Sequence, residues 1–345
     1  MSFKLNNDYV IGKKVFIIAE IGSTHCASME KAKYLIDCCV DAKVDCVKFQ
    51  KRDIESLLTK KEREREYNSA NSMGKTYGEH RKVMEFSKEQ FFELKRYCDE
   101  KKILMSASAW DKKSVDFLDE LDIPFYKVAS ADLTNLPLLI HIAKKQKPVF
   151  LSTGMGDVYD VIRAVSTISR YEKRIVLFQC TSSYPCPFNE INLNVLKNYQ
   201  DIFSELVIGY SGHEEGYVIP CVAVGIGAKV IEKHITFDKN ARGSDHKAAL
   251  DIEELNLLVK NIRNTEMSLG NYNKEIQNSE KKCITKLCKS IVSTRRIEKG
   301  EVIKEDMITT KSPGTGIRAN YYYELIGKRI TKSIEEDKTI TSDYF

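Results

Sequence analysis

The sequence lacks an apolar run long enough to span a membrane, and it lacks an apolar leader. Residues 1–14 are polar and mixed in charge, unlike a signal peptide. It also lacks a large excess of charge of one sign, because 54 Lys and Arg are interspersed with 49 Asp and Glu, for a net charge of +5. We therefore expect neither a membrane nor a nucleic-acid partner, since nucleic-acid binding needs a basic surface.

The ten cysteines lack the paired spacing of a zinc motif. Cys38 and Cys39 fall in a predicted helix, and Cys46 and Cys180 fall in predicted buried strands. Disulfides are rare in the cytosol, so we interpret these residues as reduced thiols of a cytoplasmic protein.

Eight short apolar runs alternate with amphipathic stretches over the first 270 or so residues. The runs cover residues 15–21, 46–50, 103–108, 124–130, 148–153, 175–180, 207–211 and 229–235. Stretches between them, such as residues 28–42, 87–101 and 157–169, carry apolar residues at helical spacing. Strand followed by helix, eight times, predicts an α/β fold of the (β/α)8 TIM-barrel class.

The pattern changes after Gly270. We predict a barrel domain over residues 1–270, a polar linker over residues 271–285 and a small turn-rich domain over residues 286–345. A segment of about 60 residues is marginal alone, so docking against the barrel is expected. Within the barrel, residues 51–86 are too long for a plain connection and predict a lid.

Polar residues gather where the predicted strands end, which is the active face of a (β/α)8 barrel. The strand ends carry Glu20 with His25, Lys48 with Gln50, Ser106 with Ser108, Lys127 with Ser130, Ser152 with Thr153, Thr181 with Ser182, Ser211 with His213, and His234. One serine there is usually a turn residue or a helix cap. Polar chemistry at all eight ends predicts an active site, and the two histidines at successive ends predict a metal site.

The motifs of the chain resemble those of the sialic acid synthases, which condense phosphoenolpyruvate with an N-acylmannosamine. In the barrel the resemblance is carried by FIIAEIGSTH (16–25), VKFQK (47–51), GKTYGEHR (74–81), FYKVASAD (125–132), LSTGM (151–155), QCTSSYP (179–185), IGYSGHE (208–214) and EKHIT (232–236). In the tail, SIVSTRRIEKGEVI (290–303) and IGKR (326–329) are similar to the family's antifreeze-like (SAF) domain. The resemblance covers nearly the whole chain.

The resemblance implies roles for individual residues. It implies His213 and His234 as metal ligands, and Glu20 and Lys48 as catalytic residues. Two imidazoles suit Mn²⁺ or Co²⁺ better than Mg²⁺, so Mn²⁺ is the expected ion. The implied phosphoenolpyruvate-binding residues are Lys48, Ser108, Lys127, Ser130, Ser152, Ser182 and Ser211. Glu20 would stabilise positive charge or act as a base, although a salt bridge with Lys48 is an alternative.

For the sugar, the resemblance implies contacts from Asp132, Tyr184, Asp245 and Arg318. It also implies a domain-swapped homodimer, in which bacterial members send an arginine of a K-R-P-G segment into the partner's active site. Here Ser312 replaces that arginine. Arg318 is the candidate substitute, and it could equally be an exposed loop charge.

The predicted function is that of an N-acetylneuraminate synthase acting on free N-acetylmannosamine, with C–O cleavage and phosphate release. The 6-phosphate and the dideoxy sugars of legionaminate and pseudaminate are the alternatives. A 6-phosphate needs further cations, for which Lys75, Arg81 and Arg242 are available but also suit a plain surface. A metal-dependent aldolase, and an ice- or carbohydrate-binding tail, are hypotheses from other classes.

Overall fold

The computed structural model describes residues 1–69 and 71–345, which form two compact units, Met1–Gly270 and Asn271–Phe345. In the first unit eight parallel strands close into a barrel in chain order, with the last strand beside the first. They are β3 (Phe16–Gly22), β4 (Cys46–Lys51), β5 (Leu104–Ala109), β6 (Tyr126–Val128), β7 (Val149–Ser152), β8 (Ile175–Cys180), β9 (Val207–Gly212) and β10 (Val230–His234). The predicted (β/α)8 barrel is confirmed.

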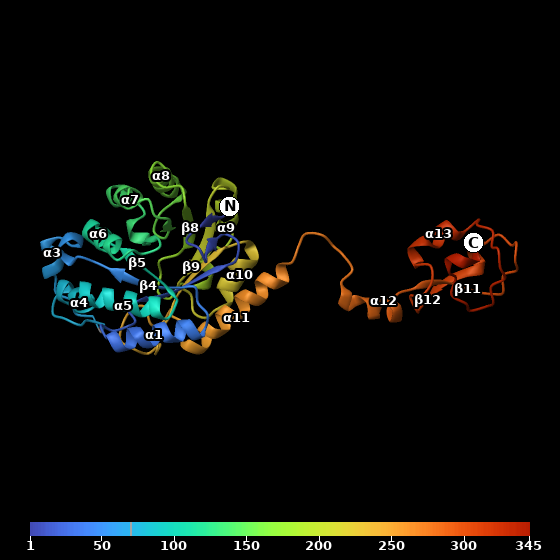
Figure 1. The fold of residues 1–345 in the computed structure, drawn as a ribbon, viewed down its shortest axis with the longest axis horizontal. Coiled ribbons are helices and arrows are strands. Elements are labelled where there is room, and N and C mark those ends of the chain that lie inside the picture. Colours follow the sequence, from blue (N-terminus) through green and yellow to red (C-terminus); the bar gives the residue numbers. More distant parts are fainter. Residues whose placement is uncertain (70) are drawn as a thin grey trace. The chain divides into compact units, whose positions relative to one another are not determined.

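Helices surround this barrel (Figure 1). They are α1 (Met29–Asp41), α5 (Lys88–Glu100), α6 (Lys112–Glu120), α7 (Leu136–Ala143), α8 (Val158–Ile168), α9 (Val195–Ile202), α10 (Val218–Ile226) and α11 (Ile252–Leu269). Ser28, Ser87, Asp111, Asp157 and Asp251 precede five of them, and each side chain accepts a hydrogen bond from an N–H in the first helical turn. Such caps satisfy N–H groups that the helix leaves unpaired, and they define where these helices begin.

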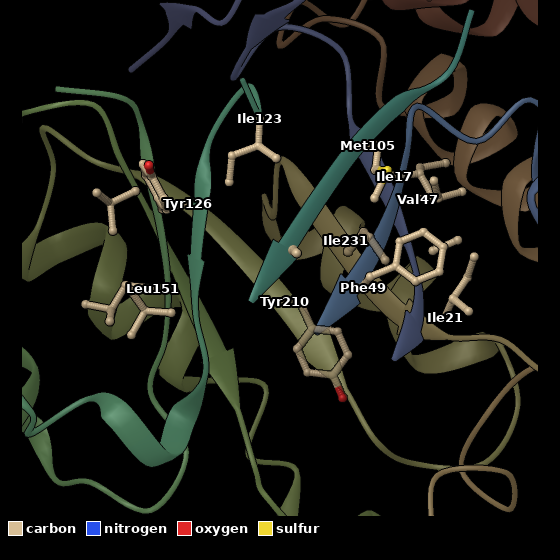
Figure 2. Close-up of a cluster of buried hydrophobic side chains, with 14 of the residues drawn as sticks. Ile17, Ile21, Val47, Phe49, Met105, Ile123, Tyr126, Leu151, Tyr210 and Ile231 are labelled. Atoms are coloured by element: carbon tan, nitrogen blue, oxygen red, sulfur yellow. The ribbon is translucent and has the colours of Figure 1, made fainter. Parts of the chain in front are cut away.

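Side-chain alternation along the strands divides the apolar core into two layers. Ile17 and Ile21 of β3 point outward into the layer shared with the helices, which Figure 2 shows. Phe16 and Ile18 belong instead to the inner cluster, together with Phe125, Phe150 and Phe178. The rings of Phe125 and Phe150 stack at 3.9 Å. This aromatic layer fills the barrel interior, and the hairpin of β1 (Phe3–Lys4) and β2 (Val10–Ile11) packs against it.

Two segments differ in detail from the prediction. The strand predicted over residues 124–130 is shorter, because Ser130–Asp132 turns into a 3-10 helix, η1, directly after β6. The predicted lid over residues 51–86 contains three short helices, α2 (Ile54–Leu57), α3 (Lys60–Glu64) and α4 (Tyr77–Val83). Closure of this segment over the barrel stays a prediction.

The second unit packs around isoleucines, with β11 (Ser290–Ser293) antiparallel to β12 (Ile308–Lys311) and a short helix, α13 (Tyr322–Leu325). The predicted linker, residues 271–285, includes η3 (Asn278–Glu280) and most of α12 (Lys281–Leu287), which the sequence did not predict. No side chain of α12 is buried, so the helix has no apolar periodicity to detect. Backbone contacts hold it instead: Gly314 N–H donates to the Thr285 carbonyl at 2.9 Å, and Ser312 Oγ donates to the Leu287 carbonyl at 3.0 Å.

The remaining short elements are the 3-10 helices η2 (Phe188–Glu190), η4 (Glu305–Met307), η5 (Ala319–Tyr321) and η6 (Ser342–Tyr344). Over the described residues, none of the helices combines the length and the apolar character that crossing a membrane requires. All ten cysteines are free thiols.

Candidate active site

A cavity of about 310 Å³ opens at the carboxyl end of the barrel strands. Fourteen of the candidate site residues named above line it: Glu20, Lys48, Gln50, Arg81, Ser108, Lys127, Ser130, Ser152, Ser182, Tyr184, Ser211, His213, His234 and Asp245. Most of them lie an even number of residues after an inward-facing strand residue such as Phe16 or Ile18, so they also point into the barrel. They form the layer above the aromatic layer. Strand alternation is therefore the reason that residues far apart in the sequence meet here.

Other polar residues at the strand ends have structural roles. Ser106, Thr153 and Thr181 donate to the backbone carbonyls of Phe125, Phe178 and Glu190 at 2.8, 2.7 and 3.1 Å. His25 stacks on Phe86, with ring centroids 4.1 Å apart. None of these four lines the cavity, although each of the eight strand ends contributes at least one other side chain that does.

The structure does not bring Asp132 into this cavity. The turn of η1 carries Asp132 to a neighbouring hollow, where Asn135 Nδ2 donates to its Oδ1 at 2.9 Å. Trp110 forms a wall of both the hollow and the cavity. Arg318 lies in the second unit, beside a hollow that this unit forms by itself. The sugar contacts expected of Asp132 and Arg318 stay predictions.

Two buried lysines contribute positive charge at the base of the strand ends. Lys48 Nζ lies 2.5 Å from Glu20 Oε2 and donates to Ser108 Oγ at 3.0 Å. Lys127 Nζ donates to Ser152 Oγ at 2.6 Å. Each ammonium group is thus held by a serine hydroxyl from the next strand of the barrel.

Glu232 joins the two lysines and was missed in the sequence. Its Oε1 lies 3.8 Å from Lys48 Nζ and 3.7 Å from Lys127 Nζ. Ser211 Oγ donates to the same oxygen at 3.2 Å, and the other oxygen is buried without a hydrogen-bond partner. The period of two along β10 would have identified Glu232, because it shares the inward face with His234.

The two carboxyl groups have opposite protonation tendencies. Burial raises the pKa of Glu20 to about 7 in spite of the opposing charge of Lys48. Burial also disfavours the charged form of Glu232, but Lys127 and Lys48 outweigh it and lower the pKa of Glu232. Glu232 is therefore ionised near neutral pH, while Glu20 can gain or lose a proton there.

Ser130 and Ser182 converge above Gly154. Gly154 N–H donates to Ser130 Oγ at 3.1 Å. A Cβ atom at Gly154 would lie 2.8 Å from Ser130 Oγ and closer still to Ser182 Oγ. Glycine at this position keeps the two hydroxyls and a backbone donor accessible in one small space, which suits a bound anion.

The two predicted metal ligands face each other, with ring centroids 5.5 Å apart. His213 Nδ1 lies 2.9 Å from the Thr181 carbonyl, so this nitrogen donates and Nε2 is the nitrogen that can bind a ligand. Burial lowers the pKa of His234 to about 3, so its ring is neutral. His234 Nδ1 is buried without a hydrogen-bond partner.

These imidazoles fit a divalent metal, because metal-ligating histidines are neutral and commonly donate their second nitrogen to a carbonyl. Within residues 1–69 and 71–345, no group of three or more His, Cys, Asp or Glu side chains is placed to hold an ion. The ring of Tyr184 covers His213, with centroids 4.1 Å apart.

Asp245 and two arginines line the cavity as well. Asp245 Oδ2 accepts from Ser23 Oγ at 2.7 Å. Burial would raise the pKa of Asp245, but the hydroxyls of Ser23 and Ser244 and the charge of Arg52 keep it below its usual value. Arg52 is tied to Glu85 at 3.0 Å and lies over the ring of Trp110 at 4.5 Å. Arg81 donates to the Tyr77 hydroxyl at 2.8 and 3.0 Å.

Arg52 and Trp110 were not predicted, because they follow the strands rather than end them. Cys180, Met155, Ser244, Ala129 and Ala131 also line the cavity. The positions of Arg52 and Trp110 depend on how the loops fold back over the barrel, for which the sequence carries no periodic signal.

Comparison with known proteins gives the family. Residues 35–274 match the NeuB family, and residues 289–344 match the SAF domain. The chain is 41% identical to the human N-acetylneuraminate-9-phosphate synthase, over 95% of this chain and 92% of that protein. It is 37% identical to the N,N'-diacetyllegionaminic acid synthase of Campylobacter jejuni, over 95% and 99% of the two chains.

Among solved structures, the fold is similar to that of the N-acetylneuraminic acid synthetase of Leptospira borgpetersenii in complex with citrate. The TM-score is 0.72 at 32% identity, covering 82% of this chain and 95% of that one. The sequence matches extend through both units, and the cavity holds the residues that the family motifs carry. The chain therefore belongs to the NeuB family of sialic acid synthases, which are phosphoenolpyruvate-dependent condensing enzymes, and it carries a C-terminal SAF domain.

Proposed function

We propose that this chain condenses phosphoenolpyruvate with N-acetylmannosamine to give N-acetylneuraminate and inorganic phosphate. The observation that supports this most is the pair of buried lysines, Lys48 and Lys127, set in a ring of serine hydroxyls. Phosphoenolpyruvate carries a carboxylate and a phosphate, and a buried site for it needs cations and short donors in fixed positions. Glu232 lies 3.8 and 3.7 Å from the two ammonium groups and favours their charged forms.

The phosphate would bind where Ser130, Ser182 and the Gly154 N–H converge, and the carboxylate would bind near Lys48 and Lys127. Both ends of phosphoenolpyruvate are then fixed, which orients its methylene carbon toward the histidines. A divalent metal held by His213 and His234 would polarise the aldehyde oxygen of the open-chain sugar. Asp245, ionised and facing the same space, is suited to accept hydrogen bonds from sugar hydroxyls.

The bond-forming step joins the methylene carbon of phosphoenolpyruvate to the aldehyde carbon of the sugar. Positive charge then develops at C2 of the former phosphoenolpyruvate, where the charged form of Glu20 can stabilise it. Water adds at C2 and gives up a proton, for which Glu20 is the candidate base because its pKa is about 7. The alkoxide formed from the aldehyde oxygen takes up a proton. Cleavage of the bond between C2 and the phosphate-bearing oxygen releases phosphate, and the C2 hydroxyl loses its proton to leave the keto acid.

One observation favours a second sugar, N-acetylmannosamine 6-phosphate. Among the described residues Arg81 forms no ion pair with a carboxylate, although its guanidinium group lines the cavity. Such a group suits a terminal phosphate. The condensation adds three carbons at C1 of the sugar, so a 6-phosphate would become the 9-phosphate of the product named for the human relative.

Phosphate release from phosphoenolpyruvate with Mn²⁺ present distinguishes the two sugars. We expect release with free N-acetylmannosamine and none without sugar. Release with the 6-phosphate alone would contradict the free-sugar proposal and keep the chemistry. In that case Arg81→Ala should raise the KM for the phosphorylated sugar by about tenfold to a hundredfold, because one charge-assisted contact is lost. The KM for phosphoenolpyruvate, measured in the same preparation, should not change.

Lys127→Met is expected to raise the KM for phosphoenolpyruvate by about a hundredfold, since a buried charge-assisted contact is lost. Methionine keeps most of the volume of the lysine stem in the core. The half-buried Lys145, which lies outside the cavity and pairs with Asp116 at 2.8 Å, offers a control as Lys145→Met. An unchanged KM in the Lys127 variant would remove this lysine from the phosphoenolpyruvate site.

A further inference from the structure

Each of the two histidines has a charged residue as its immediate neighbour in the sequence, and these two neighbours carry opposite charges. Glu214 follows His213, and Lys233 precedes His234. His213 and His234 line the cavity, whereas Glu214 and Lys233 do not. Successive side chains of an extended chain point to opposite faces, so the two neighbours lie on the outer side of the barrel wall. They are nevertheless fully enclosed, with exposed fractions of 0% and 1%.

Glu214 and Lys233 bind each other and the hydroxyl of Tyr210. Lys233 Nζ lies 3.1 Å from Glu214 Oε1, and the same ammonium group donates to the backbone carbonyl of Glu214. The Tyr210 hydroxyl donates to Glu214 Oε2 at 2.7 Å. Tyr210 is part of the outer apolar layer shown in Figure 2. We name this cluster of Tyr210, Glu214 and Lys233 the brace.

The brace lies where the backbone pairing between β9 and β10 stops. The last paired residues are Lys233 and Gly212, so His213 lies beyond the ladder. Beyond that point the two segments are connected by side-chain contacts, because Lys233 binds both the carboxylate and the backbone carbonyl of Glu214. Gly212 makes room for this arrangement: a Cβ atom there would lie 2.6 Å from the Tyr210 ring and 2.7 Å from Glu214 Oε1.

Stability alone is a poor explanation for such a pair. Enclosing two charges costs about as much as their attraction returns, and apolar replacements of similar size are often tolerated. A role in fixing the position of the backbone at His213 is a better explanation, because removing either partner would remove the contacts that hold the adjacent Glu214. We therefore propose that the brace positions His213 against His234 for metal binding, which makes Tyr210, Glu214 and Lys233 positioning residues. This inference rests on the proposed metal role of the two histidines.

Mn²⁺ binding to the full-length protein, followed by the EPR signal of the free ion, tests the proposal. Glu214→Gln and Tyr210→Phe are expected to weaken Mn²⁺ binding by about 10- to 100-fold, the usual effect of losing a group that orients a metal ligand. Glu172→Gln is the matched control. It breaks another ion pair of a buried carboxylate, with the partly exposed Arg174 at 2.6 Å, just before β8 at the opposite end of the barrel. It should leave Mn²⁺ binding unchanged.

A second measurement needs no metal. In protein labelled with [15N]histidine, the resonances of His213 report its tautomer, and the Thr181 contact predicts a single Nδ1-protonated form in the wild type. The variants of the brace should show a mixture of tautomers, and Glu172→Gln should not. If Glu214→Gln does not fold, Tyr210→Phe and the double variant Glu214→Gln/Lys233→Met decide the matter, since both avoid an unpaired buried charge.

Wild-type Mn²⁺ affinity together with a single His213 tautomer in folded brace variants would overturn the proposal. If the wild type itself binds no Mn²⁺, the metal role of the histidines fails, and the tautomer measurement still decides whether the brace positions His213.

Discussion

Replacing His213 by alanine is expected to lower the metal-dependent rate by about a thousandfold or more, because Lewis-acid stabilisation contributes several kcal/mol to such a reaction. The ring of His213 is buried at the cavity wall, and its Nδ1 is committed to the Thr181 carbonyl. Only the opposite nitrogen is left to bind a ligand. The rate of phosphate release against Mn²⁺ concentration measures the loss, and binding of Mn²⁺ itself should weaken in parallel.

His141→Ala is the control for that experiment. His141 lies on α7, where its Nε2 contacts Asp116 at 2.8 Å and its side chain is partly exposed. Its removal should leave both the rate and Mn²⁺ binding unchanged. Full activity of His213→Ala, or of the wild type after complete chelation of divalent metals, would contradict the metal-assisted mechanism.

Glu20→Gln is expected to lower kcat by about 10²- to 10⁴-fold, the usual contribution of a positioned acid or base. The pKa of Glu20 is about 7 because the side chain is buried. A base must be deprotonated, so the wild-type rate should rise with pH through this value, and the variant should lose that rise. Glutamine keeps the shape of the side chain and its contact with Gln50, which lies 2.8 Å away.

Phosphoenolpyruvate binding separates a chemical defect from a binding defect. Trp110 is the single tryptophan of the sequence, and it lines the cavity, so its fluorescence reports ligand binding directly. Glu20→Gln should still bind phosphoenolpyruvate, and the exposed control Glu93→Gln should match the wild type in every respect. A Glu20 variant with normal kcat and a normal pH profile would leave Glu20 as a structural partner of Lys48 alone.

Much of the barrel was predictable because its signals are local. A run of β-branched and aliphatic residues predicts a strand wherever it occurs, and the residues after it lie at the active face of a parallel barrel. Lys48, Lys127, Ser152, His213 and His234 were identified on that basis, together with the family motifs. The helix in the predicted linker was missed because α12 has no buried face.

The sequence by itself thus determined the order of the strands along the chain and the face to which each strand residue points. Apolar spacing and strand ends are local features that do not depend on distant contacts. The tertiary structure decided which polar residues share the cavity. Glu232 meets both lysines, Asp132 turns away with η1, and Glu214 meets Lys233 behind the histidines. The physical reason is that these contacts join residues of different strands and loops, whose distances depend on barrel closure and loop packing rather than on any period along the chain.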